Sequence, residues 1–160
     1  KAVELWDKIM EAGEEKGLLP AGLGARDTLR FEAGLVLYGN ELSQEISPLE
    51  AGLGRFVKLD KEYFIGKDAL VKQNKEGVKR MLVGFEMIDR GIARSQYKIY
   101  YEDKEIGVVT SGSFAPTFQK NLGLALIDPA YSEIGTEILV IVRKKALKAK
   151  VVKIPFYSRK

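Results

Sequence analysis

EIGVVTSGSFAPTFQKNLGLALID, residues 105–128, decides the fold class of this chain. It contains two apolar runs, EIGVVTSG (105–112) and LGLALID (122–128), of the length and composition that strands have. Gly112 and Pro116 interrupt the apolar pattern, and both residue types are typical of turns. The stretch therefore predicts two short strands joined by a turn.

Four further runs of the same kind lie on either side of this stretch. They are RMLVGFEMI (80–88), QYKIYYE (96–102), TEILVIVR (136–143) and LKAKVVKIPF (147–156). The pairs Asp103-Lys104 and Lys145-Ala146 are predicted hairpin turns. Six short strands at close spacing are typical of an antiparallel barrel or sandwich.

The first half of the chain has a helical period instead. An apolar stripe predicts an amphipathic helix over residues 2–16, and a second helix is expected from about Leu23 to Ala33. Ser47-Pro48-Leu49-Glu50 is a capping-box pattern that predicts a short helix, and GKDALVKQNK (66–75) predicts another. The class is therefore α+β, with a mixed helical part over 1–77 and a β-rich domain over 78–160.

Charged and apolar residues alternate around the axis of the predicted helix within GLGARDTLRFEAG, residues 22–34. Arg26, Asp27, Arg30 and Glu32 cannot all face solvent if this helix packs between neighbours. Buried charges persist only when they are paired or bound to a ligand. The pattern alone leaves open whether the partner is the protein itself or a ligand.

Composition excludes several kinds of site. The 160 residues include no cysteine and no histidine, so we expect no disulfide, no thiolate nucleophile and no zinc or iron–sulfur site. The chain has no apolar run long enough to span a membrane, and we expect a soluble, cytoplasmic protein with no membrane partner.

The net charge of +4 is unevenly distributed, because basic residues dominate the end of the chain. After Glu137 they are Arg143, Lys144, Lys145, Lys148, Lys150, Lys153, Arg159 and Lys160. They either guard an exposed strand edge or attract an anionic ligand or partner. A nucleic-acid partner is not expected, since no nucleic-acid-binding motif accompanies the charge.

Four stretches together resemble the aminomethyltransferase, or T-protein, family of the glycine cleavage system. They are AGLGARDTLRFEAGLVLYGNEL (21–42), ISPLEAGLGRFVKLDKEYFIGKDAL (46–70), TSGSFAPTFQKNLGLALID (110–128) and AKVVKIPFY (149–157). They occur in the family's order and spacing, and the resemblance covers the whole chain. It matches less than half of a family member, at its C-terminal end.

The resemblance implies a fold and a reaction. Residues 1–77 would be the C-terminal remainder of the folate-binding domain, and residues 78–160 would be the C-terminal β-barrel. The family takes the aminomethyl group carried by the lipoyl arm of the H-protein, transfers its one-carbon unit to tetrahydrofolate and releases its nitrogen. Ammonia and methylenetetrahydrofolate are the products. The implied partners are thus lipoylated H-protein and tetrahydrofolate, and no metal is implied.

The resemblance also assigns roles to individual residues. Arg26 matches an arginine of the family's substrate-binding set, and Arg159 is a candidate for a second ligand residue in the C-terminal tail. The family's catalytic aspartate and a pterin-binding glutamate are expected upstream of Lys1, so the chain alone is expected to be inactive. Asp27, Arg30 and Glu32 are predicted to form internal salt bridges. The segment TSGSFAPTFQKN (110–121) is predicted to be structural.

Three other interpretations remain open. The chain resembles the folate-binding C-terminal module of flavin-linked dimethylglycine or sarcosine dehydrogenases as well. A folate-binding relative linked to iron–sulfur assembly is disfavoured, because its motif contains a cysteine that this chain lacks. The chain by itself also fits a non-catalytic structural fragment.

Overall fold

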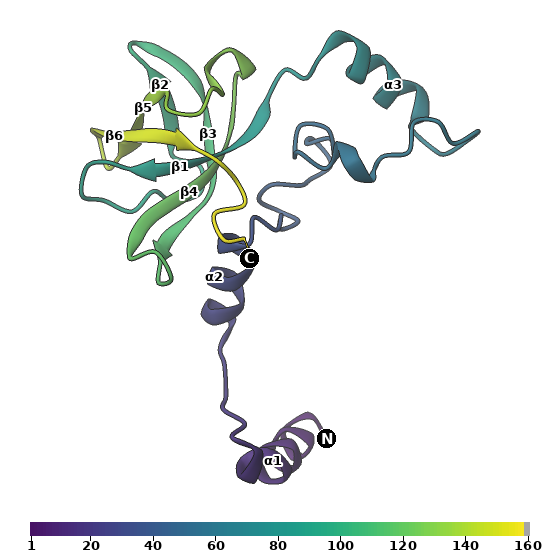
Figure 1. Ribbon diagram of the computed structural model, residues 1–160, viewed down its shortest axis with the longest axis vertical. Helices are drawn as coiled ribbons and strands as arrows, with labels where there is room; N and C mark the ends of the chain where they lie inside the picture. The colour runs from purple at the N-terminus through teal and green to yellow at the C-terminus, as the bar shows by residue number, and fades with distance from the viewer. Residues whose placement is uncertain (159–160) are drawn as a thin grey trace.

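The computed structural model describes residues 1–158. The second half forms a closed antiparallel barrel with the strand order β1-β4-β3-β2-β5-β6 (Figure 1). The strands are β1 (Met81–Met87), β2 (Lys98–Tyr101), β3 (Lys104–Ala115), β4 (Lys120–Ile127), β5 (Glu137–Val142) and β6 (Lys145–Val152). The predicted α+β class is confirmed, and closure decides for the barrel over the sandwich.

Pairing between β1 and β6 closes the barrel, with Phe85 opposite Val151 in the register. Strand residues alternate between the interior and the outer face. Phe85 and Val151 lie in the barrel core together with Ile99 and Val140, each at most 1% exposed. The ring of Phe85 lies directly over Gly123 on β4, where a β-carbon would overlap it. The interior is thus filled by side chains from strands far apart in the sequence.

Both predicted hairpin turns lie slightly too late in the sequence. Lys104 is the first residue of β3, so the turn after β2 is Glu102-Asp103. Lys145 opens β6, and the turn between β5 and β6 is Arg143-Lys144. Both residues of that turn have positive φ, 48° and 72°, which matches the twist of hairpin strands. The turn could not be placed from the sequence, because Arg143-Lys144 contains neither glycine nor asparagine, the residues typical of such turns.

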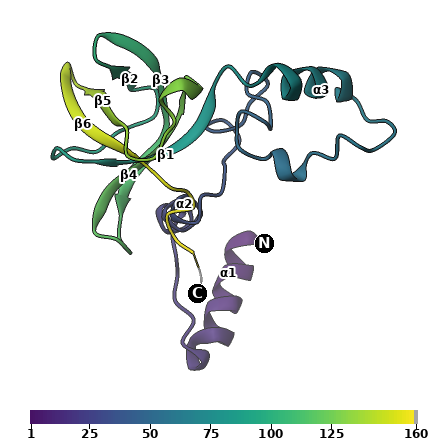
Figure 2. The same ribbon diagram turned by 45° about the horizontal axis from the view of Figure 1, so that its top comes forward.

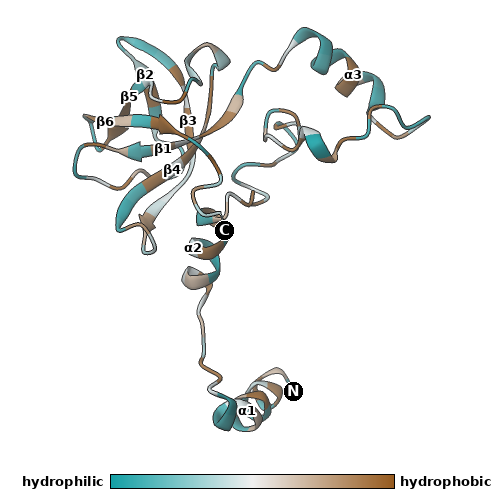
Figure 3. Ribbon diagram, viewed as in Figure 1, coloured by the Kyte–Doolittle hydropathy of each residue, from teal (hydrophilic) through white to brown (hydrophobic). Residues whose placement is uncertain are grey.

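The helices are α1 (Ala2–Gly13), α2 (Leu23–Glu32) and α3 (Lys67–Glu76), with single 3-10 turns η1 (Glu14–Lys16), η2 (Gly54–Phe56) and η3 (Pro129–Tyr131). They confirm the helices predicted at 2–16, 23–33 and 66–75. In two views α1 and α3 lie away from the barrel, whereas α2 lies beside it (Figures 1 and 2). Coloured by hydropathy, α1 alternates between hydrophobic and hydrophilic segments (Figure 3). None of its residues is buried against the rest of residues 1–158.

The capping box at Ser47 does not begin a helix. Its two reciprocal bonds are present, since the Glu50 N–H donates to the Ser47 hydroxyl (3.2 Å) and the Ser47 N–H donates to the Glu50 carboxylate (2.9 Å). Gly52 then takes a positive φ of 72°, and residues 48–52 are turns. The box therefore fixes a turn, and the helix predicted there is wrong.

The linker between the two halves runs from the end of α3 at Glu76 to the start of β1 at Met81. The domain division at 77/78 stays a prediction. Within residues 1–158, no helix is both long and apolar enough to cross a membrane.

Candidate functional site

Helix α2 packs on β3 and carries both arginines of the stretch GLGARDTLRFEAG (22–34), Arg26 and Arg30. Its C-terminal end is anchored by Phe31, which is 1% exposed and contacts the ring of Phe156 at a centroid distance of 5.3 Å. Phe31 belongs to a second apolar cluster, outside the barrel, with Leu122 and Leu124 of β4. The N-terminal end is different, because residues 23–27 are all exposed. The helix is thus held at one end and open at the other.

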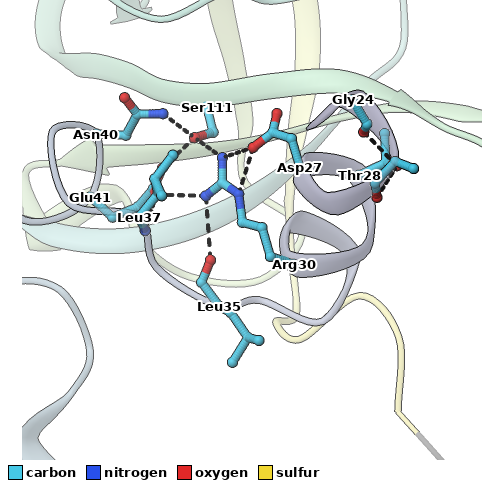
Figure 4. A network of polar contacts seen from close by, with 10 residues as sticks. Gly24, Asp27, Thr28, Arg30, Leu35, Leu37, Asn40, Glu41 and Ser111 are labelled. Carbon is cyan, nitrogen blue, oxygen red and sulfur yellow. Dashed lines mark hydrogen bonds and ion pairs between the residues drawn. The ribbon is translucent and has the colours of Figure 1, made fainter. Parts of the chain in front are cut away.

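Arg30 turns inward and is surrounded by acceptors (Figure 4). Its Nε donates to Asp27 Oδ1 (2.8 Å), and its Nη1 donates to Glu41 Oε2 (2.9 Å) and the Leu35 carbonyl (3.3 Å). Its Nη2 donates to Ser111 Oγ (3.0 Å) and also lies 2.8 Å from Asp27 Oδ1. Every nitrogen of this guanidinium therefore has a partner within the protein.

Glu41 supplies the buried counter-charge. Its side chain is fully buried, and that of Arg30 is only 10% exposed. Besides Arg30, it accepts hydrogen bonds from the Leu37 N–H (3.0 Å) and the Ser111 hydroxyl (2.6 Å). A buried ion pair is tolerated when its remaining polar atoms are hydrogen-bonded in this way. The network joins α2, the loop 35–41 and β3.

Ser111 reaches this network because β3 is irregular there. The register of β3 against β4 shifts between Val109 and Ser111. Such bulges commonly redirect a side chain. The Ser111 hydroxyl accepts from Asn40 Nδ2 (3.1 Å) and Arg30, and donates to Glu41. These contacts agree with a structural role for the segment 110–121.

Arg26 lies one helical turn before Arg30, so the two side chains project from the same face of α2. Arg26 is exposed, and within residues 1–158 it makes no hydrogen bond or ion pair. It lines a surface hollow of about 400 Å³ beside Arg30, Leu29 and Leu35. The remaining lining residues are Ala21, Gly22 and Ala25. Arg30 is therefore paired within the protein, whereas the guanidinium of Arg26 is available to a ligand.

The predicted salt bridges are confirmed for Asp27 and Arg30 but not for Glu32. Glu32 is 5% exposed, and its carboxylate accepts the backbone N–H of Thr117 at 3.1 Å. Its own carbonyl accepts from the Tyr157 N–H at 2.8 Å. In the part of the chain that the structure describes, no cation pairs with it. Glu32 therefore fastens α2 to the β3–β4 turn through a backbone group.

Sequence reasoning missed Glu41 and Ser111 as members of the network. A signal for Glu41 exists, because it is the single charge in LVLYGNEL (35–42). Nothing local points to Ser111, which lies 81 residues from Arg30. Arg159 lies outside the described residues, and the ligand role of Arg26 stays a prediction.

The basic residues of the β5–β6 hairpin do not guard an edge, so that interpretation is wrong for them, whereas Arg159 and Lys160 lie outside the described residues. The barrel is closed, and β5 and β6 are each paired on both sides. Lys148 and Lys150 are exposed, whereas Ala149 and Val151 between and after them are buried. Among residues 1–158, neither lysine has a salt bridge. The lysines belong to a solvated outer face of the barrel.

Metal binding has no structural support in the described part of the chain. Residues 1–158 contain no group of three or more acidic, cysteine or histidine side chains that could hold an ion.

Comparisons with known proteins agree with this architecture. The family model described as the GCVT N-terminal domain matches residues 1–61, and that described as the glycine cleavage T-protein C-terminal barrel domain matches residues 80–158. The chain is similar to a protein named aminomethyltransferase from Thermoanaerobacter pseudethanolicus, with 61% identity over 158 residues. Its identity to another of that name, from Caldanaerobacter subterraneus subsp. tengcongensis, is 63% over 158 residues.

These alignments cover 99% of this chain but only 43% and 42% of the two relatives. The chain thus spans less than half the length of the curated relatives that it matches. Among solved structures, it resembles the glycine cleavage system aminomethyltransferase T from Bartonella henselae, with a TM-score of 0.88 and 32% identity. That match covers 98% of this chain and 44% of the other. On the two family models and these relatives together, the chain belongs to the glycine cleavage T-protein family.

Proposed function

We propose that the full-length protein containing this chain is the aminomethyltransferase of the glycine cleavage system. Its substrates are H-protein that carries the aminomethyl group on a sulfur of its lipoyl arm, and tetrahydrofolate. Its products are methylenetetrahydrofolate, ammonia and H-protein with the lipoyl arm in its dithiol form. The curated relatives that carry the aminomethyltransferase name support this assignment at about 60% identity, as in the 61% of the Thermoanaerobacter pseudethanolicus protein.

The observation that carries the proposal is the unpaired guanidinium of Arg26. A guanidinium presents five N–H donors in a plane and stays charged when buried, so it suits a carboxylate or a heterocyclic acceptor. Tetrahydrofolate offers both kinds of acceptor. The hollow beside Arg26 is otherwise apolar on the side of Ala25 and Leu29, which suits the ring systems of that molecule. The described residues therefore fit a folate.

Arg26 binds and orients folate in this proposal, and it does not perform the chemical step. Arg159 is proposed as a second contact. The catalytic aspartate that the family resemblance implies has no assigned counterpart among these residues. We therefore propose that the 160-residue chain alone is inactive.

The test is a transfer assay with the full-length protein. Purified enzyme, aminomethyl-loaded H-protein and tetrahydrofolate should yield methylenetetrahydrofolate and ammonia in equal amounts. Omitting H-protein should abolish product formation. Product formation from dimethylglycine or sarcosine with a flavin, and none from loaded H-protein, would establish the oxidase-linked alternative instead. Turnover by the 160-residue chain alone would show that it contains the whole catalytic machinery.

A further inference from the structure

We propose that Arg30, Glu41 and Ser111 are positioning residues. They fix the rotation of helix α2 about its own axis and so hold the Arg26 side chain where it can bind folate. This inference rests on the proposed folate role of Arg26. We call the three residues the α2 clasp. None of them needs to touch the substrate.

The contacts of the α2 clasp fix the rotation of α2 about its axis as well as its distance from the barrel. Apolar contacts such as that between Phe31 and Phe156 hold the helix against the barrel, but they are not directional. Hydrogen bonds are directional, and the Arg30 guanidinium donates to groups on two other segments. One of these, Ser111, belongs to the barrel, and the other, Glu41, belongs to the loop that follows α2. The helix cannot rotate without breaking several of these bonds.

The rotation of α2 matters for Arg26 because little else in residues 1–158 restrains that end of the helix. Residues 23–27 are exposed, and the helix is preceded by a segment without regular structure that is also exposed. Arg26 stands on the same helix face as Arg30, one turn away. Any rotation of α2 that moves Arg30 therefore moves Arg26 as well. Glu32 adds a second attachment, but it lies beyond Arg30, at the far end of the helix from Arg26.

A second ion pair with a buried glutamate provides a control, and it differs in that its arginine, Arg80, is 44% exposed where Arg30 is 10% exposed. Glu50 is 7% exposed on its side chain and pairs with Arg80 at 2.8 Å, close to the 2.9 Å of the Glu41–Arg30 pair. Both pairs involve a largely buried glutamate in the first half of the chain. Among the described residues, neither Glu50 nor Arg80 makes a hydrogen bond or ion pair with α2. A change to either glutamate should lower stability, and only a change to Glu41 should affect folate.

The experiment compares Glu41→Gln, Ser111→Ala and Glu50→Gln in the full-length enzyme, assayed well below the lowest Tm. Networks that act through a second residue change binding by about 0.5–2 kcal/mol, which is about 2- to 30-fold. Glu41→Gln and Ser111→Ala should raise KM for tetrahydrofolate by that factor and leave KM for H-protein unchanged. Ser111→Thr keeps the hydroxyl and should restore much of the folate KM. Glu50→Gln should lower Tm with an unchanged folate KM.

A double-mutant cycle shows whether the clasp acts through Arg26. In an Arg26→Ala background, Glu41→Gln should cause no further increase in the folate KM. A lowered Tm with normal folate KM in both Glu41→Gln and Ser111→Ala would overturn the clasp proposal alone, because Arg26→Ala would still be impaired. If Arg26→Ala itself has a normal folate KM, the folate role of Arg26 fails, and the clasp proposal fails with it. If Glu41→Gln does not fold, Ser111→Ala decides the question.

Discussion

Replacing Glu41 by leucine should be among the most destabilising single changes in this chain. The substitution removes the acceptor of three hydrogen bonds and leaves the Arg30 guanidinium, only 10% exposed, without its buried counter-charge. Removing one partner of a buried ion pair costs about 3–5 kcal/mol. At about 2–4 °C per kcal/mol, Tm should fall by about 6–20 °C. Thermal and urea unfolding of the full-length protein, followed by circular dichroism, would measure the change.

The double variant Arg30→Met/Glu41→Leu separates pairing from simple loss of contacts. Because it leaves no uncompensated charge between the two residues, it should cost less than the sum of the single variants, by about 0.5–3 kcal/mol. Glu105→Leu is the control, since Glu105 pairs with Lys98 at 2.7 Å on the exposed surface and should barely change Tm. A Glu41→Leu protein as stable as the Glu105→Leu protein, or a strictly additive double variant, would show that the buried Arg30–Glu41 pair does not stabilise the fold.

Three further predictions concern the barrel and its attachments. Burial raises the pKa of the Glu50 carboxyl, but hydrogen bonds from Arg80 and the Ser47 N–H outweigh it, so the pKa lies below its ordinary 4.5. The stability that this lowered pKa provides is present above about pH 4.5 and is lost as the pH falls through the lower folded-state pKa. In Glu50→Gln, Tm should therefore fall less steeply as the pH is lowered below about 4.5. Gly107→Ala should lower Tm strongly, because the new β-carbon would overlap the Leu126 carbonyl oxygen. Gly24→Ala is the mild control, since Gly24 has open space at that position and no positive φ. Neutralising three exposed lysines of the β5–β6 hairpin should raise KM for polyglutamylated folate or H-protein at low salt, and the difference should vanish as salt rises. An unchanged KM at low salt would mean that these lysines are only solvated surface residues. The three are Lys144, Lys145 and Lys148.

The sequence predicted the local elements well because their signals are local. The helical stripe over 2–16 and the apolar runs of the second half indicated the helices and strands that the structure contains. Barrel closure has no such signal, since it depends on pairing between Phe85 and Val151 across most of the second half. Alternation in β6 predicts a strand with one polar face but does not say whether another strand lies beside it. The edge interpretation of the lysines failed for that reason.

The candidate site shows the same limit. The mixed charges of residues 22–34 correctly predicted that some charged groups turn inward. The charge pattern could not show which of Arg26 and Arg30 is paired within the protein, because the pairing depends on the positions of Glu41 and Ser111. Ser111 lies far along the chain, on a strand whose register shift directs its hydroxyl toward α2. The salt bridge predicted for Glu32 failed for a similar reason. Its partner is a backbone N–H, and the sequence gives no signal for such a partner.

A direct titration tests whether Arg26, which has no partner within residues 1–158, binds folate. Tetrahydrofolate binding should be measured by calorimetry for the full-length wild type, Arg26→Ala and Arg26→Lys. A hydrogen bond to a charged group contributes about 1.5–3 kcal/mol, so Arg26→Ala should weaken binding at least about tenfold. Arg26→Lys should restore little, because an ammonium group lacks the planar fork. Tm should not change, since Arg26 has no partner within residues 1–158. An Arg26→Ala protein that binds tetrahydrofolate with wild-type affinity would show that Arg26 does not hold the folate.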